Sequence, residues 1–145
     1  MAGTLAAIEH LAWLGKIIST DDLNRREALS VAFTAIEEYE SELCWSMIQG
    51  LQKIEGLKIW GVTDPSMKKN RAPTVSFTHP SMMAEEIGAK LAEEGIFAWA
   101  GNFYALELSE ALGLEPEGAL RVGLLHYNTK EEVDRFIKVL NGILG

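Results

Sequence analysis

Residues 119–135 encode a β-strand followed at once by a capped helix, and this pair constrains the fold more than any other stretch. Apolar residues in its first half alternate at the two-residue period of a strand: Leu120, Val122 and Leu124. Thr129, with Glu132 three positions later, has the pattern of a capping box, which begins a helix. Apolar residues then recur at helical spacing: Val133, Phe136, Ile137 and Leu140. The pattern predicts a strand that stops sharply and a helix that starts within a few residues.

The remaining chain is expected to form further helices and short strands. Helices are predicted at residues 1–18, 24–54, 82–94 and 103–112, strands at residues 57–62, 72–78 and 96–100, and a turn at residues 63–66. Ser19–Asp22 should cap the second helix, and Ser81 should cap the third. The order predicts an α+β fold: a small, mainly antiparallel four-stranded sheet packed with helices and led by a long N-terminal helix.

The long helix over residues 24–54 carries an apolar stripe near the helical period. Its members are Leu29, Ala32, Phe33, Ile36, Tyr39, Leu43, Met47, Leu51 and Ile54, and we expect them to pack in the core. Cys44 lies in the same helix and is the single cysteine, so it cannot form an internal disulfide. We expect it to be a small buried hydrophobic residue.

Composition excludes several classes of function. The 145 residues are 48% hydrophobic, which indicates one globular domain, and the formal net charge of −8 argues against a nucleic-acid binder. The longest apolar runs are too short for a transmembrane span, and no signal peptide is apparent, so a cytoplasmic location is expected. The three histidines are far apart in sequence and are expected at the surface or at strand ends, which leaves no predicted metal site.

Arg121 is the residue that needs a functional explanation, because it places a permanent charge in the middle of a strand. It shares strand parity with Gly123, which has no side chain to block approach. A planar guanidinium beside bare backbone suits bidentate binding of a carboxylate. A salt bridge to a nearby glutamate on an exposed sheet face explains the charge equally well, and both readings stay open at this point.

Several segments together resemble the class V aminotransferase family, which includes the cysteine desulfurases. Arg121–Gly123, His126–Thr129 and Glu132–Asp134 look like the C-terminal signature of that family. Weaker resemblances are found in the segments Arg71–Phe77, Gly95–Ile96 and Gly101–Ala105, and in Gly3–Ile8 with Leu14–Gly15. The resemblance implies that residues 1–18 are the end of a large-domain helix and that residues 19–145 form the small C-terminal domain. The absence of an N-cap before Gly3 agrees with a helix that continues from upstream.

The resemblance also implies a site and a cofactor. Such enzymes bind pyridoxal phosphate (PLP) through a lysine of the large domain, are usually homodimers, and act on amino acids. Arg121 matches the arginine that binds the substrate α-carboxylate, and Asn102 and Tyr104 fall in the active-site loop. Tyr104 occupies the place where cysteine desulfurases keep their persulfide-forming cysteine, which puts desulfurase activity in doubt.

Two functions therefore compete. In the first, the chain is the substrate-closing domain of a PLP-dependent enzyme, inactive by itself because no lysine here has the Ser-x-His-Lys context of the family. In the second, it is a standalone α+β binding or dimerisation module without catalysis, which would use the apolar side of its first helix as an interface.

Overall fold

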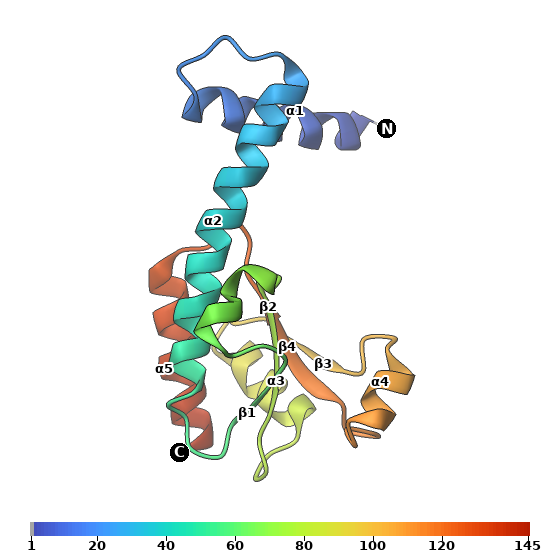
Figure 1. The fold of residues 1–145 in the computed structure, drawn as a ribbon. Coiled ribbons are helices and arrows are strands. Elements are labelled where there is room, and N and C mark those ends of the chain that lie inside the picture. Colours follow the sequence, from blue (N-terminus) through green and yellow to red (C-terminus); the bar gives the residue numbers. More distant parts are fainter. Residues whose placement is uncertain (1) are drawn as a thin grey trace. The chain divides into compact units, whose positions relative to one another are not determined.

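The computed structural model describes residues 2–145, which form two compact units. Residues up to Glu40 form the first unit and Ser41–Gly145 form the second. The first contains α1 (Ala2–Ile18) and the beginning of α2 (Arg25–Leu51). The second contains the remainder of α2 and all later elements (Figure 1).

The first unit is held by close packing of two helices through small residues. A Cβ placed on Gly15 would lie 1.8 Å from the carbonyl oxygen of Ala28, so only glycine permits this approach. Ala12 and Ala28 are buried beside it. The helix α2 is capped by Asn24, whose Oδ1 accepts from the Glu27 amide at 3.1 Å, while the Asn24 amide donates to Glu27 Oε2 at 2.9 Å. The predicted cap at Ser19–Asp22 is therefore wrong.

The predicted apolar stripe of α2 belongs to the main hydrophobic cluster in its second half only, although Ala32 in its first half is also buried. Leu43, Met47 and Leu51 are buried, whereas the side chains of Phe33 and Tyr39 are 56% and 44% exposed. Both exposed residues belong to the first unit, where two helices provide too little partner surface to cover every apolar side chain. Cys44 is buried, as expected.

A four-stranded sheet organises the second unit. Its strands are β1 (Lys58–Trp60), β2 (Thr74–Thr78), β3 (Trp99–Gly101) and β4 (Ala119–Gly123). They run in the order β1-β2-β4-β3, and every neighbouring pair is antiparallel. This sheet with its helices confirms the predicted α+β fold.

One face of the sheet forms the core with helices α2, α3 (Ala84–Glu93) and α5 (Lys130–Leu144). The sheet contributes Val75, Phe77, Leu120 and Val122, all of which are buried. Figure 1 shows α5 beside the lower part of α2. The approach is close, because a Cβ on Gly50 would meet Ile137 at 2.7 Å. The opposite face of the sheet carries the alternate residues, and no helix of the core cluster packs there.

Several predicted boundaries differ in the structure. The third helix begins at Ala84 without a side-chain cap, because the Ser81 hydroxyl bonds instead to His79 Nδ1 at 2.9 Å. A short 3-10 helix, Pro65–Asn70, occupies and extends beyond the predicted turn. The third strand begins three residues later than predicted, and α4 (Leu106–Ala111) is shorter than predicted at both ends. The start of α4 is delayed because Phe103 and Tyr104 have positive φ, which is incompatible with a right-handed helix.

Gly118→Ala should destabilise the second unit by about 2–4 kcal/mol. Gly118 has a φ of +70°, and a Cβ there would lie 2.4 Å from the Gly101 carbonyl carbon, so the substitution adds both backbone strain and a clash. The measurement is the free energy of unfolding in urea.

Gly113→Ala provides the matched control for that experiment. Gly113 has a nearly equal φ of +69°, but nothing lies within 4 Å of a Cβ at this position. Gly113→Ala should therefore lower the free energy of unfolding by only about 1 kcal/mol, which is the strain of a positive φ. Equal losses for the two variants would contradict the predicted backbone clash.

Candidate functional site

Arg121 lies at the centre of β4, on the sheet face opposite the core. Its neighbours in sequence, Leu120 and Val122, are buried, and Arg121 itself is half-buried. Successive strand residues point to opposite faces, so the buried pair directs Arg121 outward. The registers place Ser76 of β2 on one side of Arg121 and Trp99 of β3 on the other.

The guanidinium of Arg121 stacks on an aromatic ring and has no acidic partner. Its Cζ lies 4.2 Å from the centroid of Phe103. Among residues 2–145, no carboxylate forms an ion pair with it. This contact with the ring leaves the charge of the guanidinium uncompensated, because an aromatic ring carries no net charge. The N–H groups at the edge of the plane are thus suited to bind an anion.

An open hollow of about 600 Å³ adjoins Arg121. It is lined by Thr74, Phe97, Ala98, Trp99, Arg121 and Gly123. Gly123 contributes only backbone, which widens the hollow beside the guanidinium. Within residues 2–145, no acidic side chain and no second cation lines it. The electrostatics of this hollow therefore favour one negative group.

The loop after β3 holds Phe103 against Arg121 through an unusual backbone. Phe103 and Tyr104 have φ values of 58° and 62°, a region that non-glycine residues seldom occupy. Asn102 Oδ1 accepts from the Tyr104 amide at 3.2 Å, and the Asn102 carbonyl accepts from the Ala105 amide at 2.9 Å. Asn102 therefore stabilises the turn that holds Phe103 next to Arg121.

The three predicted site residues are not all brought together. Arg121 lines the hollow, whereas Asn102 and Tyr104 do not. The Tyr104 side chain is 98% exposed, so it contacts little of the protein. Phe103 is the neighbour of Arg121 that sequence reasoning missed, although it lies inside the motif Gly101–Ala105 that carried part of the resemblance.

The residues that follow β4 have a structural role, because they form the connection from β4 to α5. Asn128 Oδ1 accepts from the Leu125 amide at 2.9 Å, and the Thr129 hydroxyl accepts from the Glu132 amide at 3.2 Å. Glu132 Oε2 accepts from the Thr129 amide at 2.8 Å and from Asn128 Nδ2 at 3.3 Å. The predicted capping box is confirmed. These bonds end β4 and start α5, and they fix the segment that follows Arg121.

The thiol of Cys44 lies away from this hollow. It is buried, does not line the hollow, and its Sγ donates weakly to the Ala72 carbonyl at 3.9 Å. Burial raises the pKa of the Cys44 thiol, with Arg71 acting in the opposite direction. The neutral thiol is a poor nucleophile.

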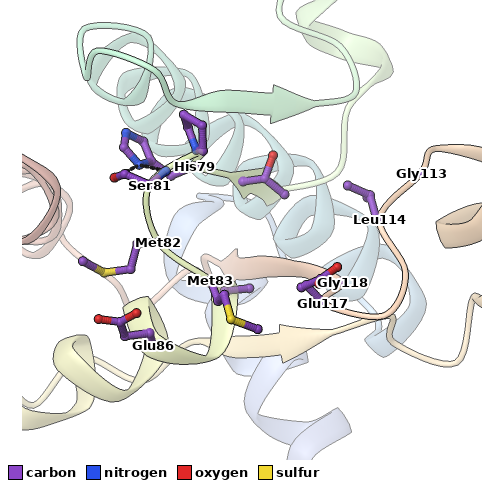
Figure 2. Close-up of a pocket in the computed structure, with 12 residues that line it drawn as sticks. His79, Ser81, Met82, Met83, Glu86, Gly113, Leu114, Glu117 and Gly118 are labelled. Carbon is purple, nitrogen blue, oxygen red and sulfur yellow. Dashed lines mark hydrogen bonds between the residues drawn. The ribbon is translucent and has the colours of Figure 1, made fainter.

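A second hollow, of about 370 Å³, surrounds the start of α3. Figure 2 shows His79 and Ser81 on one side of it and Leu114 and Glu117 on the other. His79 Nε2 donates to the Glu55 carbonyl at 2.9 Å, and its Nδ1 is within 2.9 Å of the Ser81 hydroxyl. Because its charged lining residues are glutamates, this hollow does not suit a carboxylate ligand. The hollow at Arg121 is the better candidate.

Comparison with known proteins identifies the family. The family described as Aminotransferase class-V matches residues 26–136, which is most of the chain. The chain belongs to the class-V aminotransferase family, as the resemblance in its sequence indicated. No described helix, within residues 2–145, has the length and apolar character needed to cross a membrane.

Individual relatives are similar over a limited part of their length. An aminotransferase-like protein of Gibberella zeae is 35% identical over 113 residues, which cover 76% of this chain and 28% of that protein. Probable cysteine desulfurase 2 of Mycobacterium leprae is 32% identical over 108 residues, covering 74% of this chain and 25% of that protein. The apo structure of cysteine desulfurase from Thermococcus onnurineus NA1 matches with a TM-score of 0.72 at 28% identity, over 83% of this chain and 28% of that one. The chain thus spans 25–28% of the length of these curated relatives.

Members of the family depend in general on PLP and act on amino acids. The residues around Arg121 do not by themselves fit PLP. Its described lining residues include no lysine to form a Schiff base and no acid to pair with a pyridine nitrogen. The hydrogen-bond donors of Arg121 fit a carboxylate instead.

The capping network gives a pH prediction at Glu132. The bond from the Thr129 amide, with help from Asn128, holds the pKa of Glu132 below its ordinary value. Its contribution to stability is therefore complete above the unfolded-state pKa of about 4.3 and disappears as the pH falls through the lower folded-state pKa. Wild type should melt at a higher temperature than Glu132→Gln at about pH 7, and this difference in melting temperature should decrease as the pH falls below about 4.3.

Glu131→Gln is the matched control, because Glu131 lies in the same first turn of α5 but does not form the capping box. Both variants lose the same charge near the helix N-terminus. If the pH-dependent loss were as large in Glu131→Gln as in Glu132→Gln, the helix dipole rather than the capping bonds would be its cause.

Proposed function

We propose that this chain is the substrate-closing domain of a PLP-dependent, class-V aminotransferase-like or cysteine-desulfurase-like enzyme that acts on an amino acid. In this proposal residues 1–18 are the end of a large-domain helix, and residues 19–145 are the small C-terminal domain. The observation that carries it is the uncompensated guanidinium of Arg121, which faces an open hollow from the centre of the sheet.

Arg121 binds the α-carboxylate of the amino acid in this proposal. The Phe103 ring holds the guanidinium from one side, so its edge can donate two parallel hydrogen bonds to one carboxylate. Gly123 leaves room for the ligand beside those donors. The fixed orientation of the guanidinium reduces the rotational freedom that a carboxylate would otherwise have to restrict on binding.

The catalytic lysine lies outside these residues in the proposal. None of the eight lysines has the Ser-x-His-Lys context that the resemblance implies for the Schiff base. The chain by itself is therefore inactive, and PLP is held by a large domain. A cytoplasmic location and a homodimeric parent are part of the same proposal.

A reaction that stores sulfur as a protein persulfide is disfavoured. Tyr104 stands where the resemblance places the reactive cysteine, and a phenol cannot form a persulfide. The thiol of Cys44 is buried and its raised pKa keeps it neutral. The parent reaction proposed here therefore excludes persulfide transfer through a cysteine of this domain.

Exposed apolar side chains on α1 favour one alternative function, a standalone dimerisation module. Leu5, Trp13 and Ile17 are all exposed in the first unit. The same residues are also expected to be exposed when the large domain is absent, so they do not separate the two functions. Carboxylate binding at Arg121 does separate them, since a dimerisation module has no need of it.

Acetate should bind at Arg121 and shift, in a saturable way, the NMR resonances of its Nε–H group and of the backbone amides of Trp99 and Gly123, which remain observable in every Arg121 variant. Arg121→Gln removes the charge and should abolish the binding. Arg121→Lys keeps the charge without the planar fork and should weaken binding by about fivefold. The titration belongs at low ionic strength, because salt screens the half-exposed charge.

Acetamide is the uncharged control for that titration, and it should cause no saturable shift. Resonances elsewhere in the sheet should be unchanged in Arg121→Gln, which shows that the fold persists. Acetate shifts that survive in Arg121→Gln would remove the basis of the proposed function.

The chain mixed with PLP should show no aldimine absorbance band that survives desalting. The reason is that no lysine lines the hollow at Arg121. Borohydride reduction followed by peptide mass spectrometry would locate any lysine that does react. A stoichiometric aldimine at one lysine would overturn the proposed inactivity of the chain.

A further inference from the structure

Two exposed aromatic side chains adjoin Arg121 on the open sheet face. Trp99 lies directly opposite Arg121 in the β3–β4 ladder. Opposite residues of an antiparallel pair keep their side chains on one face, with Cβ atoms about 5 Å apart. The side chains of Trp99 and Phe97 are 62% and 87% exposed, and both line the hollow. They offer apolar ring surface directly beside an unpaired cation.

The rest of the hollow offers little to a polar ligand. Among the described residues that line it, the polar side-chain groups besides Arg121 are the Thr74 hydroxyl and the Trp99 indole N–H. Lys58 of β1 lies on the same sheet face, but its Nζ lies 3.6 Å from the Trp60 ring centroid and it does not line the hollow. A second carboxylate in the ligand would find no second cation among the described residues that line the hollow. An aromatic or bulky apolar group would instead cover the exposed rings.

We infer that the site takes amino acids with an aromatic or other bulky apolar side chain, and that Trp99 and Phe97 form the wall that contacts this side chain. The inference rests on the proposed function, because it assumes that Arg121 binds the carboxylate. To the proposed function it adds the class of the substrate and two residues that determine specificity, Trp99 and Phe97. Trp99 is the principal one, since its strand pairing fixes it beside Arg121.

Gly123 provides the space that such a side chain needs. A Cβ built at Gly123 would lie 3.5 Å from Thr74 Oγ1, an ordinary contact, and its φ is outside the left-handed region. Gly123 is therefore not required by the backbone of β4. A valine there would fill part of the hollow and suit the strand geometry.

The test compares phenylacetate with acetate on the full 145-residue chain, followed through the indole N–H resonance of Trp99 and the Nε–H resonance of Arg121. Phenylacetate should bind about fivefold more tightly than acetate. Trp99→Ala should reduce this preference for phenylacetate over acetate to less than about twofold. Gly123→Val should weaken phenylacetate by about fivefold or more, and acetate by less.

Trp60→Ala is the matched control, because Trp60 lies on the same sheet face but does not line the hollow. It should keep the full preference for phenylacetate. Phenylacetamide reports how far the ring binds without a carboxylate, and it should bind much more weakly than phenylacetate.

The outcomes separate this inference from the proposed function. Equal affinities for acetate and phenylacetate, both lost in Arg121→Gln, would overturn the aromatic specificity and leave the carboxylate role of Arg121 intact. If Trp99→Ala kept the preference for phenylacetate over acetate, Trp99 would not form the wall that contacts the substrate side chain. Equal binding of phenylacetate and phenylacetamide that persists in Arg121→Gln would contradict both the inference and the proposed function, as would the absence of binding by every probe.

Discussion

The alternation of β4 between a buried and an open sheet face is the constraint on which the candidate site depends. Leu120 and Val122 belong to the core cluster, and Arg121 lies between them. A slip of one residue in the register would expose both apolar side chains and drive an unpaired guanidinium into the core. Burial of an isolated charge costs several kcal/mol even after relaxation of the protein. The core therefore determines where the charge of Arg121 is presented.

A second constraint, from the loop after β3, acts on the same guanidinium. Gly118 and Gly101 approach so closely that neither the backbone before β4 nor the end of β3 can shift freely. The loop then passes through two non-glycine residues with positive φ before α4 begins. Such conformations cost of order 1–3 kcal/mol each and persist where surrounding structure enforces them. Here the result is a ring placed against Arg121, in agreement with a preorganised anion site.

Local signals in the sequence were sufficient for most of the fold. The β4–α5 pair was predicted correctly because alternation, a capping box and helical periodicity all act within a few residues. The helix predicted from Phe103 was wrong at its start, since positive φ at Phe103 is enforced by tertiary structure and leaves no local signal. Ser81 was expected to cap α3 because serine is a preferred N-cap residue. Its hydroxyl instead forms a hydrogen bond with His79 Nδ1. Arg121 was proposed as a site residue from its charge in a strand, its strand parity with Gly123 and the resemblance, whereas the position of the Phe103 ring beside it depends on a loop conformation that has no local signal.

The segment that best marks the family is separate from the groups that would decide the reaction. Asn128, Thr129 and Glu132 bond to one another and to the backbone, so a family can retain them for the strand-to-helix connection whatever its chemistry. The type of reaction depends instead on the side chains that surround Arg121. There the chain has Trp99 in the hollow, and Tyr104 stands where desulfurases are expected to carry a thiol. Membership of the family thus supports a carboxylate site, while the identity of the reaction depends on side chains that the family signature does not constrain.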